Sequence, residues 1–370
     1  MKLSYISDFK LPSNKAYSIH VFKMLDSFCK LGISSELIIP HSSENINKNY
    51  LKNFYNLRNN NLIKLKTFFK FFKDMNFIYR IMFGFKVALY LKSIKKERII
   101  IARSLIASIF LILFKIPHFL EIHQELKGLS KLFLINLRFI NSKYVIKVIF
   151  ISNQLSKFYC ICKNSIVLHD GVDLEDFKKY KKKIRDIKTI TYTGSLYKGR
   201  GIEKIIKVAT KFPKIVFKIY GKRNENIQIN SKNIKVFRFI KHSQVPRILN
   251  QSDLLIMPYS KKVSLNADNF SQDIGKFTSP LKMFEYLASG TPILSSNLKV
   301  LREVLKNNKN AFLVNNYENT EEWEKKIKKI LNNKKLLKRI SLNAKKTAIN
   351  FTWDLRVKKY LKEYKKFKQL

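Results

Sequence analysis

The sequence predicts an α/β protein made of two Rossmann-like domains. Short apolar, β-branched runs alternate with helical stretches along the whole chain, a pattern typical of parallel sheets covered by helices. The alternation pauses at a charged segment, Lys178–Asp186, and begins again at Thr189. At 370 residues, the chain is long enough for two domains with separate cores. We therefore expect one domain over residues 1–170 and a second over residues 187–350.

The first domain has the signals of a parallel sheet. Its expected strands are Leu3–Ile6, Ser35–Ile39, Arg98–Ala102, Phe119–His123, Val145–Ile151 and Ser165–Leu168. A helix is expected over Ala16–Leu31, where Gly32 can end it. The apolar run Ser104–Phe114 predicts a buried helix, because it is too short to cross a bilayer.

The segment Leu62–Met75 places apolar residues at helical spacing with lysines between them. We predict an amphipathic helix here, and two interpretations stay open. The helix can lie on an anionic membrane surface, where its lysines meet lipid headgroups. Alternatively, its aromatic residues pack against the sheet of the first domain.

The second domain repeats the pattern and adds a glycine-rich turn. Its expected strands are Thr189–Tyr192, Ile215–Tyr220, Asp253–Met257 and Ala311–Val314, and its expected helices begin at Ile202 or cover Gln244–Asn250 and Glu321–Ile330. Between the first strand and its helix, the turn Thr193–Gly201 contains three glycines and the cations Lys198 and Arg200. Because glycines allow close backbone approach and cations balance negative charge, this turn suits a diphosphate.

A helix followed by a short strand is expected over Ser279–Ser296. Ser279 can cap the helix, and Gly290 can end it in a left-handed conformation. Glu285 lies at the border of the apolar face, where a carboxylate needs a partner. That partner can be Lys282, one turn back, or the hydroxyl of a ligand.

The composition restricts the class of protein. A formal charge of +47 favours polyanionic partners, but the lysines recur along the whole chain, which favours compositional bias over one binding surface. Three cysteines, Cys29, Cys160 and Cys162, form no disulfide framework and no zinc motif, which favours a reducing cytoplasm. The first residues resemble a strand more than a secretory signal, so we expect a soluble or peripheral protein.

Two motifs resemble those of a known enzyme family. The segment SPLKMFEYLA at 279–288 resembles the nucleotide-sugar signature of retaining GT-B glycosyltransferases, family 4, also described as glycosyl transferases group 1. Val167–Phe177 resembles the N-G-V-D-x-x-x-F segment of that family, with Asp170 in place of Asn. The resemblance implies two Rossmann-like domains facing a cleft and a closing helix, residues 353–370, that crosses back to the first domain.

The resemblance also implies a role for individual residues. The expected donor-binding residues are Gly194, Ser195, Lys198, Arg200, Gly221, Ser279, Leu281, Lys282 and Glu285. Glu285 would bind the ribose and Gly221 would lie near the base, whereas His123 would be catalytic, close to the transferred sugar. Besides Asp170, the chain departs from the family in two places. Ser195 replaces an arginine that Arg200 can substitute for, and Phe277 replaces the first glutamate of the signature, with Asp273 nearby.

The implied activity is transfer of a sugar, with retention, from a nucleotide-diphosphate sugar to an acceptor hydroxyl. No metal or other cofactor is expected. The acceptor would be a saccharide or a lipid-linked molecule used for cell-surface polysaccharide or glycolipid synthesis, in the cytoplasm or at the inner face of the membrane. One alternative is a sugar-nucleotide epimerase of the same architecture. A basic nucleic-acid-binding protein is another, but the sequence contains no motif of that kind, and nucleic acid is not an expected partner.

Overall fold

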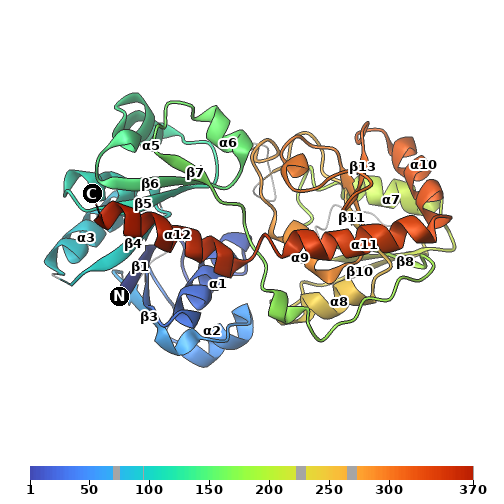
Figure 1. The fold of residues 1–370 in the computed structure, drawn as a ribbon, viewed down its shortest axis with the longest axis horizontal. Coiled ribbons are helices and arrows are strands. Elements are labelled where there is room, and N and C mark those ends of the chain that lie inside the picture. Colours follow the sequence, from blue (N-terminus) through green and yellow to red (C-terminus); the bar gives the residue numbers. More distant parts are fainter. Residues whose placement is uncertain (70–75, 95, 222–230, 265–272, 370) are drawn as a thin grey trace. The chain divides into compact units, whose positions relative to one another are not determined.

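A computed structural model of the chain describes residues 1–69, 76–94, 96–221, 231–264 and 273–369. These residues form two compact units, each a parallel sheet with helices around it (Figure 1). Unit 1 consists of Met1–His169 together with Trp353–Leu370, and unit 2 consists of Asp170–Thr352. The predicted fold class, α/β with two Rossmann-like domains, is confirmed.

The sheet of unit 1 has the strand order β3-β2-β1-β4-β5-β6-β7, and all paired strands are parallel. The strands are β1 (Lys2–Ile6), β2 (Ser34–Ile39), β3 (Ile63–Thr67), β4 (Arg98–Ala102), β5 (His118–Ile122), β6 (Val145–Phe150) and β7 (Ser165–Val167). The central strands are buried along nearly their whole length, because helices cover the sheet. The apolar runs that the sequence analysis assigned to strands thus form the central strands β1, β4 and β5.

The helices of unit 1 come from both ends of the chain. They are α1 (Ala16–Lys30), α2 (Lys48–Tyr55), α3 (Phe77–Ser93), α4 (Leu105–Leu113), α5 (Gly128–Lys131), α6 (Asn153–Phe158) and α12 (Trp353–Lys368). The expected helices at α1 and α4 are confirmed, and the side chain of Ser104 caps α4. Helix α12 packs against α1 and β6, so the last residues of the chain complete the first unit (Figure 1).

The predicted helix over Leu62–Met75 is wrong where the structure describes it. Residues Ile63–Thr67 form β3, which pairs in parallel with β2, and residues 70–75 lie outside the described part. Ile63 is buried while Lys64 is exposed, so the alternating period of a strand prevailed over the helical one. Phe68 and Phe69 pack against the core of unit 1, as the second interpretation expected.

Unit 2 repeats the architecture with the strand order β10-β9-β8-β11-β12-β13, again all parallel. Its strands are β8 (Thr189–Thr193), β9 (Val216–Tyr220), β10 (Ile234–Phe237), β11 (Leu254–Met257), β12 (Ile293–Ser296) and β13 (Phe312–Val314). Its helices are α7 (Ile202–Thr210), α8 (Val245–Gln251), α9 (Leu281–Ser289), α10 (Thr320–Leu331) and α11 (Lys334–Ala348).

Helix α9 begins at Leu281, one residue later than expected. Pro280 occupies the N-cap position without a side-chain cap, and the hydroxyl of Ser279 instead accepts a hydrogen bond from the backbone N–H of Asp170, at 3.2 Å. At the other end, Gly290 adopts the expected left-handed conformation, with φ of 68°. Ser279 therefore joins α9 to the segment that opens unit 2.

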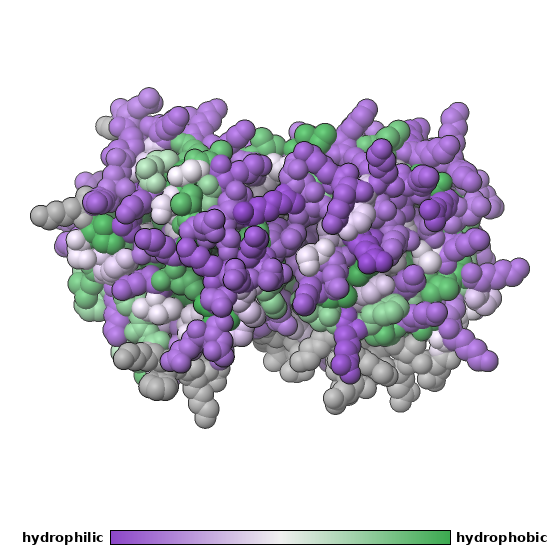
Figure 2. Space-filling model, turned by 90° about the horizontal axis from the view of Figure 1, so that it is seen from below, coloured by the Kyte–Doolittle hydropathy of each residue, from purple (hydrophilic) through white to green (hydrophobic). Residues whose placement is uncertain are grey.

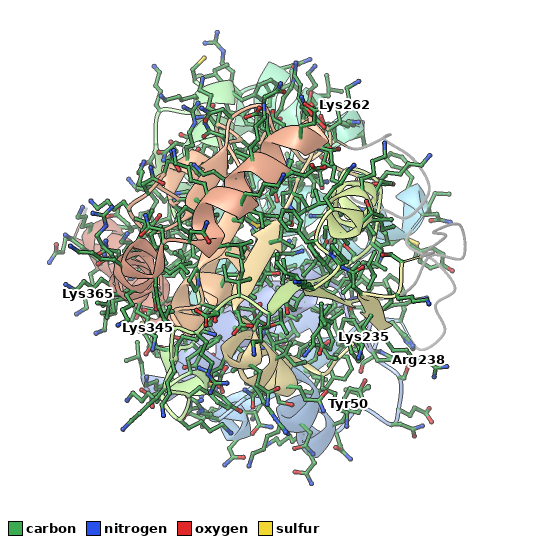
Figure 3. The ribbon with its side chains drawn as sticks, turned by 90° about the vertical axis from the view of Figure 1, so that its right-hand side faces the viewer. Tyr50, Lys235, Arg238, Lys262, Lys345 and Lys365 are labelled. Carbon is green, nitrogen blue, oxygen red and sulfur yellow. The ribbon has the colours of Figure 1, made fainter. Side chains whose placement is uncertain are left out.

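The surface carries charge in many places. The face in Figure 2 is mainly hydrophilic, with smaller apolar patches between the charged side chains. In unit 2, Lys235 lies on β10 and Arg238 follows that strand (Figure 3). Among the helices that the structure describes, none combines the length and hydropathy needed to cross a bilayer.

Candidate active site

In unit 2, the chain order of the sheet reverses between β8 and β11, and this switch point positions the candidate site. Ligands of open parallel sheets bind at the carboxyl ends of strands beside such a point. Here the carboxyl end of β8 leads into the turn Thr193–Gly201, and that of β11 leads into Pro258 and Tyr259. The predicted glycine-rich turn therefore starts where this fold favours a ligand.

Backbone contacts fix the beginning of the turn. The N–H of Thr193 donates to the hydroxyl of Tyr286 on α9 at 2.9 Å, and the N–H of Gly194 donates to the carbonyl of Tyr220 at 2.9 Å. A Cβ at Gly221 would overlap the carbonyl oxygen of Gly194. Gly221 thus permits the close approach of the two strand ends.

The remaining glycines of the turn serve the protein itself. Gly199 and Gly201 both have φ of 79°, and a Cβ on either would overlap a backbone carbonyl, of Lys262 or of Pro258 respectively. The loop that follows β11 therefore packs directly on the turn, and the N–H of Ser260 donates to the carbonyl of Gly199 at 2.9 Å. The sequence suggested a diphosphate as the close neighbour of these glycines, but that neighbour is the loop.

Two cationic side chains, those of Lys282 and Arg200, lie close to the turn and to the ring of Tyr259. The ammonium of Lys282 lies 3.8 Å from the ring centroid of Tyr192 and is buried, without a hydrogen-bond partner among the described residues. A Cβ on Gly194 would lie 2.6 Å from this nitrogen, so Lys282 reaches the turn. Arg200 donates to the hydroxyl of Tyr259 at 2.9 Å. Burial first, and then the charge of Arg200, hold the pKa of Lys282 well below its usual range.

The other predicted donor residues of the turn lie differently. Lys198 is exposed, and its backbone carbonyl accepts from the N–H of Ser264 at 3.0 Å. The carbonyl of Ser195 accepts from the hydroxyl of Tyr192 at 2.7 Å. The side chains of Arg200 and Lys282 thus both lie near the ring of Tyr259, whereas the side chain of Lys198 is exposed to solvent.

Glu285 has a partner that sequence reasoning missed. Its Oε1 lies 2.6 Å from Nε2 of His242, which belongs to the connection between β10 and α8. The side chains are only 13% and 15% exposed, and no ion pair joins Glu285 to Lys282 in the described part of unit 2. No spacing rule connects His242 with Glu285, because the contact depends on how the β10–α8 connection folds over α9.

The residues around the missing first glutamate of the signature have structural roles. Oδ1 of Asp273 accepts from the backbone N–H groups of Val263 and Gly275, at 2.9 and 2.8 Å. Phe277 is buried, and Leu281 is half-buried at the start of α9. One oxygen of Asp273 thus already ties its loop together.

The predicted catalytic residue, His123, lies in unit 1 directly after β5. Its Nε2 is 3.3 Å from Glu121, a carboxylate that is buried beside His20 and Arg356. Burial opposes ionisation of Glu121, but Arg356 and His20 outweigh it and hold its pKa well below the usual range. Burial and the charge of Arg103 lower the pKa of His123 to about 3, so its imidazole is neutral at physiological pH.

This cluster also has the composition of a metal site. Ligand atoms of His20, Glu121 and His123 lie within 4.8 Å of one another. However, the hydroxyls of Tyr5 and Tyr360 already donate to Glu121, as does Arg356 at 2.8 Å. A carboxylate with these donors on both oxygens fits a hydrogen-bond network better than a metal ligand.

Unit 2 matches a known protein family in sequence. Residues 173–347 match the family model "Glycosyl transferases group 1". A curated relative, spore coat protein SA of Bacillus subtilis (strain 168), is 23% identical over 137 residues, which is 36% of this chain and 32% of that protein. The chain thus matches about a third of the length of that relative.

Solved structures match along nearly the whole chain. HepE of Anabaena, in complex with UDP and glucose, has a TM-score of 0.68 at 12% identity, with 98% of this chain and 99% of HepE covered. WaaG, described as a glycosyltransferase involved in lipopolysaccharide biosynthesis, has a TM-score of 0.63 at 11% identity, covering 96% and 98%.

Together, the two parallel sheets and these matches define a protein with the GT-B fold of glycosyltransferases. The family model covers nearly all of unit 2, and this match supports the resemblance to glycosyl transferases group 1 that the sequence shows.

Proposed function

We propose that the protein transfers a sugar, with retention, from a nucleotide-diphosphate sugar to an acceptor hydroxyl. The observation that carries this proposal is the buried ammonium of Lys282, which has no hydrogen-bond partner among the described residues and lies beside Arg200 and the turn that follows β8. A bound diphosphate would supply the missing acceptor and stabilise both cations. The UDP and glucose in the HepE complex support a donor of this class.

The protein's part in this reaction is positioning and electrostatic stabilisation. Lys282 and Arg200 would balance the charge that develops on the departing diphosphate, with help from the positive end of α9. Because two cations are available there, we propose that transfer needs neither a metal ion nor another cofactor. Neutral His123 would donate or accept a hydrogen bond at the sugar without adding charge.

A nucleotide-sugar panel with a thermal-shift readout tests the donor site. A ligand that binds only the folded protein raises its melting temperature. We expect one class of nucleotide sugar to stabilise the wild type and Lys335→Met, whose lysine is exposed on α11, but not Lys282→Met. Absence of any shift with the wild type would overturn the proposal.

Product analysis distinguishes transfer from epimerisation. With acceptor present, transfer yields free nucleoside diphosphate and a new glycoside of the donor's anomeric configuration. An epimerase of this architecture would change the sugar without consuming an acceptor. We propose a saccharide or lipid-linked acceptor in cell-surface polysaccharide or glycolipid synthesis, which the described role of WaaG supports.

We also propose that the protein works in the cytoplasm at the inner face of the membrane, with α3 rather than Leu62–Met75 on the lipid. Ile78, Met82, Phe85 and Leu89 are exposed and follow one another at steps of four, three and four residues, on one face of α3. This helix contains no acidic residue. The ammonium groups of Lys86 and Lys92 lie over aromatic rings, 4.9 and 5.3 Å from the centroids. Such an apolar face with cations beside it suits anionic headgroups.

Vesicle co-sedimentation tests this surface. Ile78→Ser with Leu89→Ser should abolish binding to anionic vesicles at an unchanged melting temperature, because both side chains are exposed. A matched control, Leu342→Ser with Ile349→Ser, removes two exposed apolar side chains from unit 2. Equal loss in both double variants, or no binding by the wild type, would contradict the proposal.

A further inference from the structure

Helix α9 carries two opposite charges that do not pair with each other. Lys282 and Glu285 are three residues apart, a spacing at which lysine and glutamate commonly form an ion pair on a helix. In this structure, Glu285 is bonded to His242 at 2.6 Å, and the ammonium of Lys282 is buried without a hydrogen-bond partner among the described residues. The one cation of the helix, Lys282, is thus left uncompensated by Glu285.

We propose that the hydrogen bond from His242 to Glu285 prevents Glu285 from pairing with Lys282. The Lys282 ammonium thereby stays available for a diphosphate. This inference rests on the proposed donor site and adds a positioning residue to it. His242 acts through Glu285 and need not touch the diphosphate. The same bond would orient Glu285 for the ribose.

Aromatic rings surround the Lys282 ammonium, as expected of a cation that binds a ligand. Its nitrogen lies 3.8 Å from the ring centroid of Tyr192 and 5.4 Å from that of Tyr259, so aromatic faces replace part of its lost hydration. Burial and Arg200 disfavour its charge, while Glu285 favours it. An arriving diphosphate would reverse this balance, because it brings negative charge and acceptor oxygens to a buried site.

Loss of His242 should change this arrangement in a specific direction. Without the imidazole, Glu285 lacks its hydrogen-bond donor, and the nearest cation on its helix is Lys282. The two side chains would then pair, and a diphosphate would have to compete with a carboxylate for the ammonium. Removing the charge of Glu285 should release Lys282 again.

Inorganic pyrophosphate is the informative probe, since it contains the diphosphate but no ribose. Calorimetry would compare the binding of pyrophosphate and UDP to the wild type and to variants. We expect His242→Ala to weaken pyrophosphate binding by about tenfold, and His242→Ala with Glu285→Gln to restore it to within about threefold of the wild type. UDP binding should stay weakened in the double variant, because the ribose contact is lost.

Two further variants keep the test valid if His242→Ala fails to fold. His242→Gln retains an N–H donor and should bind pyrophosphate as the wild type does. Glu285→Gln alone should keep pyrophosphate binding within about threefold of the wild type, because no ion pair joins Glu285 to Lys282 among the described residues. Tightening of pyrophosphate binding by Glu285→Gln would instead mean that Glu285 already competes for Lys282.

The possible failures separate the two proposals. If the wild type binds neither pyrophosphate nor UDP, the proposed donor site is wrong. If the wild type binds both and His242→Ala binds pyrophosphate equally well, the role of His242 is wrong while the donor site stands. The same conclusion follows if the double variant binds pyrophosphate as weakly as His242→Ala.

Discussion

His118, at the start of β5, is a buried histidine with a defined tautomer. Its Nδ1 donates to the carbonyl of Ile116 at 2.9 Å, so its Nε2 accepts from the hydroxyl of Ser108 at 2.7 Å. Burial lowers its pKa from 6.5 to about 4, because a protonated ring would lose its acceptor nitrogen without gaining water. The native state thus requires the neutral ring.

This requirement predicts how stability depends on pH. The depressed pKa contributes stability that is fully present above 6.5 and is lost as pH falls toward about 4. Within that window, His118 alone should cost up to about 1.4 kcal/mol per pH unit. Urea denaturation at several pH values measures the slope, which should be smaller in His118→Asn. An identical slope in that variant would contradict the prediction.

Lys198 tests whether the exposed cation of the turn contributes to donor binding. We expect Lys198→Ala to raise the KM for the nucleotide sugar severalfold, because an exposed cation near a diphosphate gives modest attraction. Lys204 makes an unsuitable control, since its ammonium bonds Ser260 and Glu318 at 2.9 and 2.5 Å. Lys207, exposed on α7, is a better one. Equal KM values in the two alanine variants would exclude Lys198 from the site.

At the scale of elements, the turn after β8 and the loop after β11 form one interlocked structure. Both Gly199 and Gly32 have a left-handed backbone, which strains any other residue. A Cβ at Gly199 would also overlap the carbonyl of Lys262, whereas a Cβ at Gly32, where φ is 74°, would have nothing within 4 Å. Gly32→Ala should therefore cost about 1 kcal/mol of backbone strain, and Gly199→Ala considerably more.

Thermal denaturation and kinetics together measure this difference. Gly199→Ala should also raise the KM for the donor, because the displaced loop carries Tyr259, the partner of Arg200. Gly32→Ala should leave the KM unchanged. A similar loss of stability in both variants would mean that the loop yields easily to the added methyl group.

Sequence reasoning found most of the elements but only part of the site. Local signals located β4 and α1 within a few residues, because buried strands and helix ends leave such signals, whereas α12 was expected from the family resemblance. Periodicity failed at β3, where Ile63 and Leu65 fit both a strand and a helix. Residue types in the turn predicted Lys198 and Arg200, and the family resemblance predicted Lys282. The pairing of His242 with Glu285, in contrast, depends on tertiary structure and leaves no local pattern.

At the scale of the whole molecule, α12 is part of the core of unit 1. Its buried residues are Trp353, Arg356, Val357, Tyr360 and Tyr364. Arg356 and Tyr360 both donate hydrogen bonds to the Glu121 carboxylate, and the charge of Arg356 contributes most to compensating its negative charge. Removing the helix would expose apolar surface and leave that charge buried, at a cost of about 3–5 kcal/mol for the charge alone.

We therefore predict that a chain ending at Thr352 loses unit 1 and retains unit 2. Limited proteolysis should give a resistant fragment that begins near Asp170, since unit 2 is continuous in sequence. In the full chain, both units should resist digestion. A shortened chain whose first 169 residues stay protected would contradict this expectation.

The divided sequence of unit 1 has a consequence for the order in which the protein is made. A ribosome delivers residues 1–169 first, then the whole of unit 2, and only at the end the helix that completes unit 1. Unit 2 can fold as a nascent chain, whereas unit 1 stays incomplete until α12 has been translated. During that interval, the partly formed sheet exposes the surface that α12 later covers, and this makes it the natural point of contact for chaperones. A finished first unit can therefore form only in a molecule that has been translated through α12.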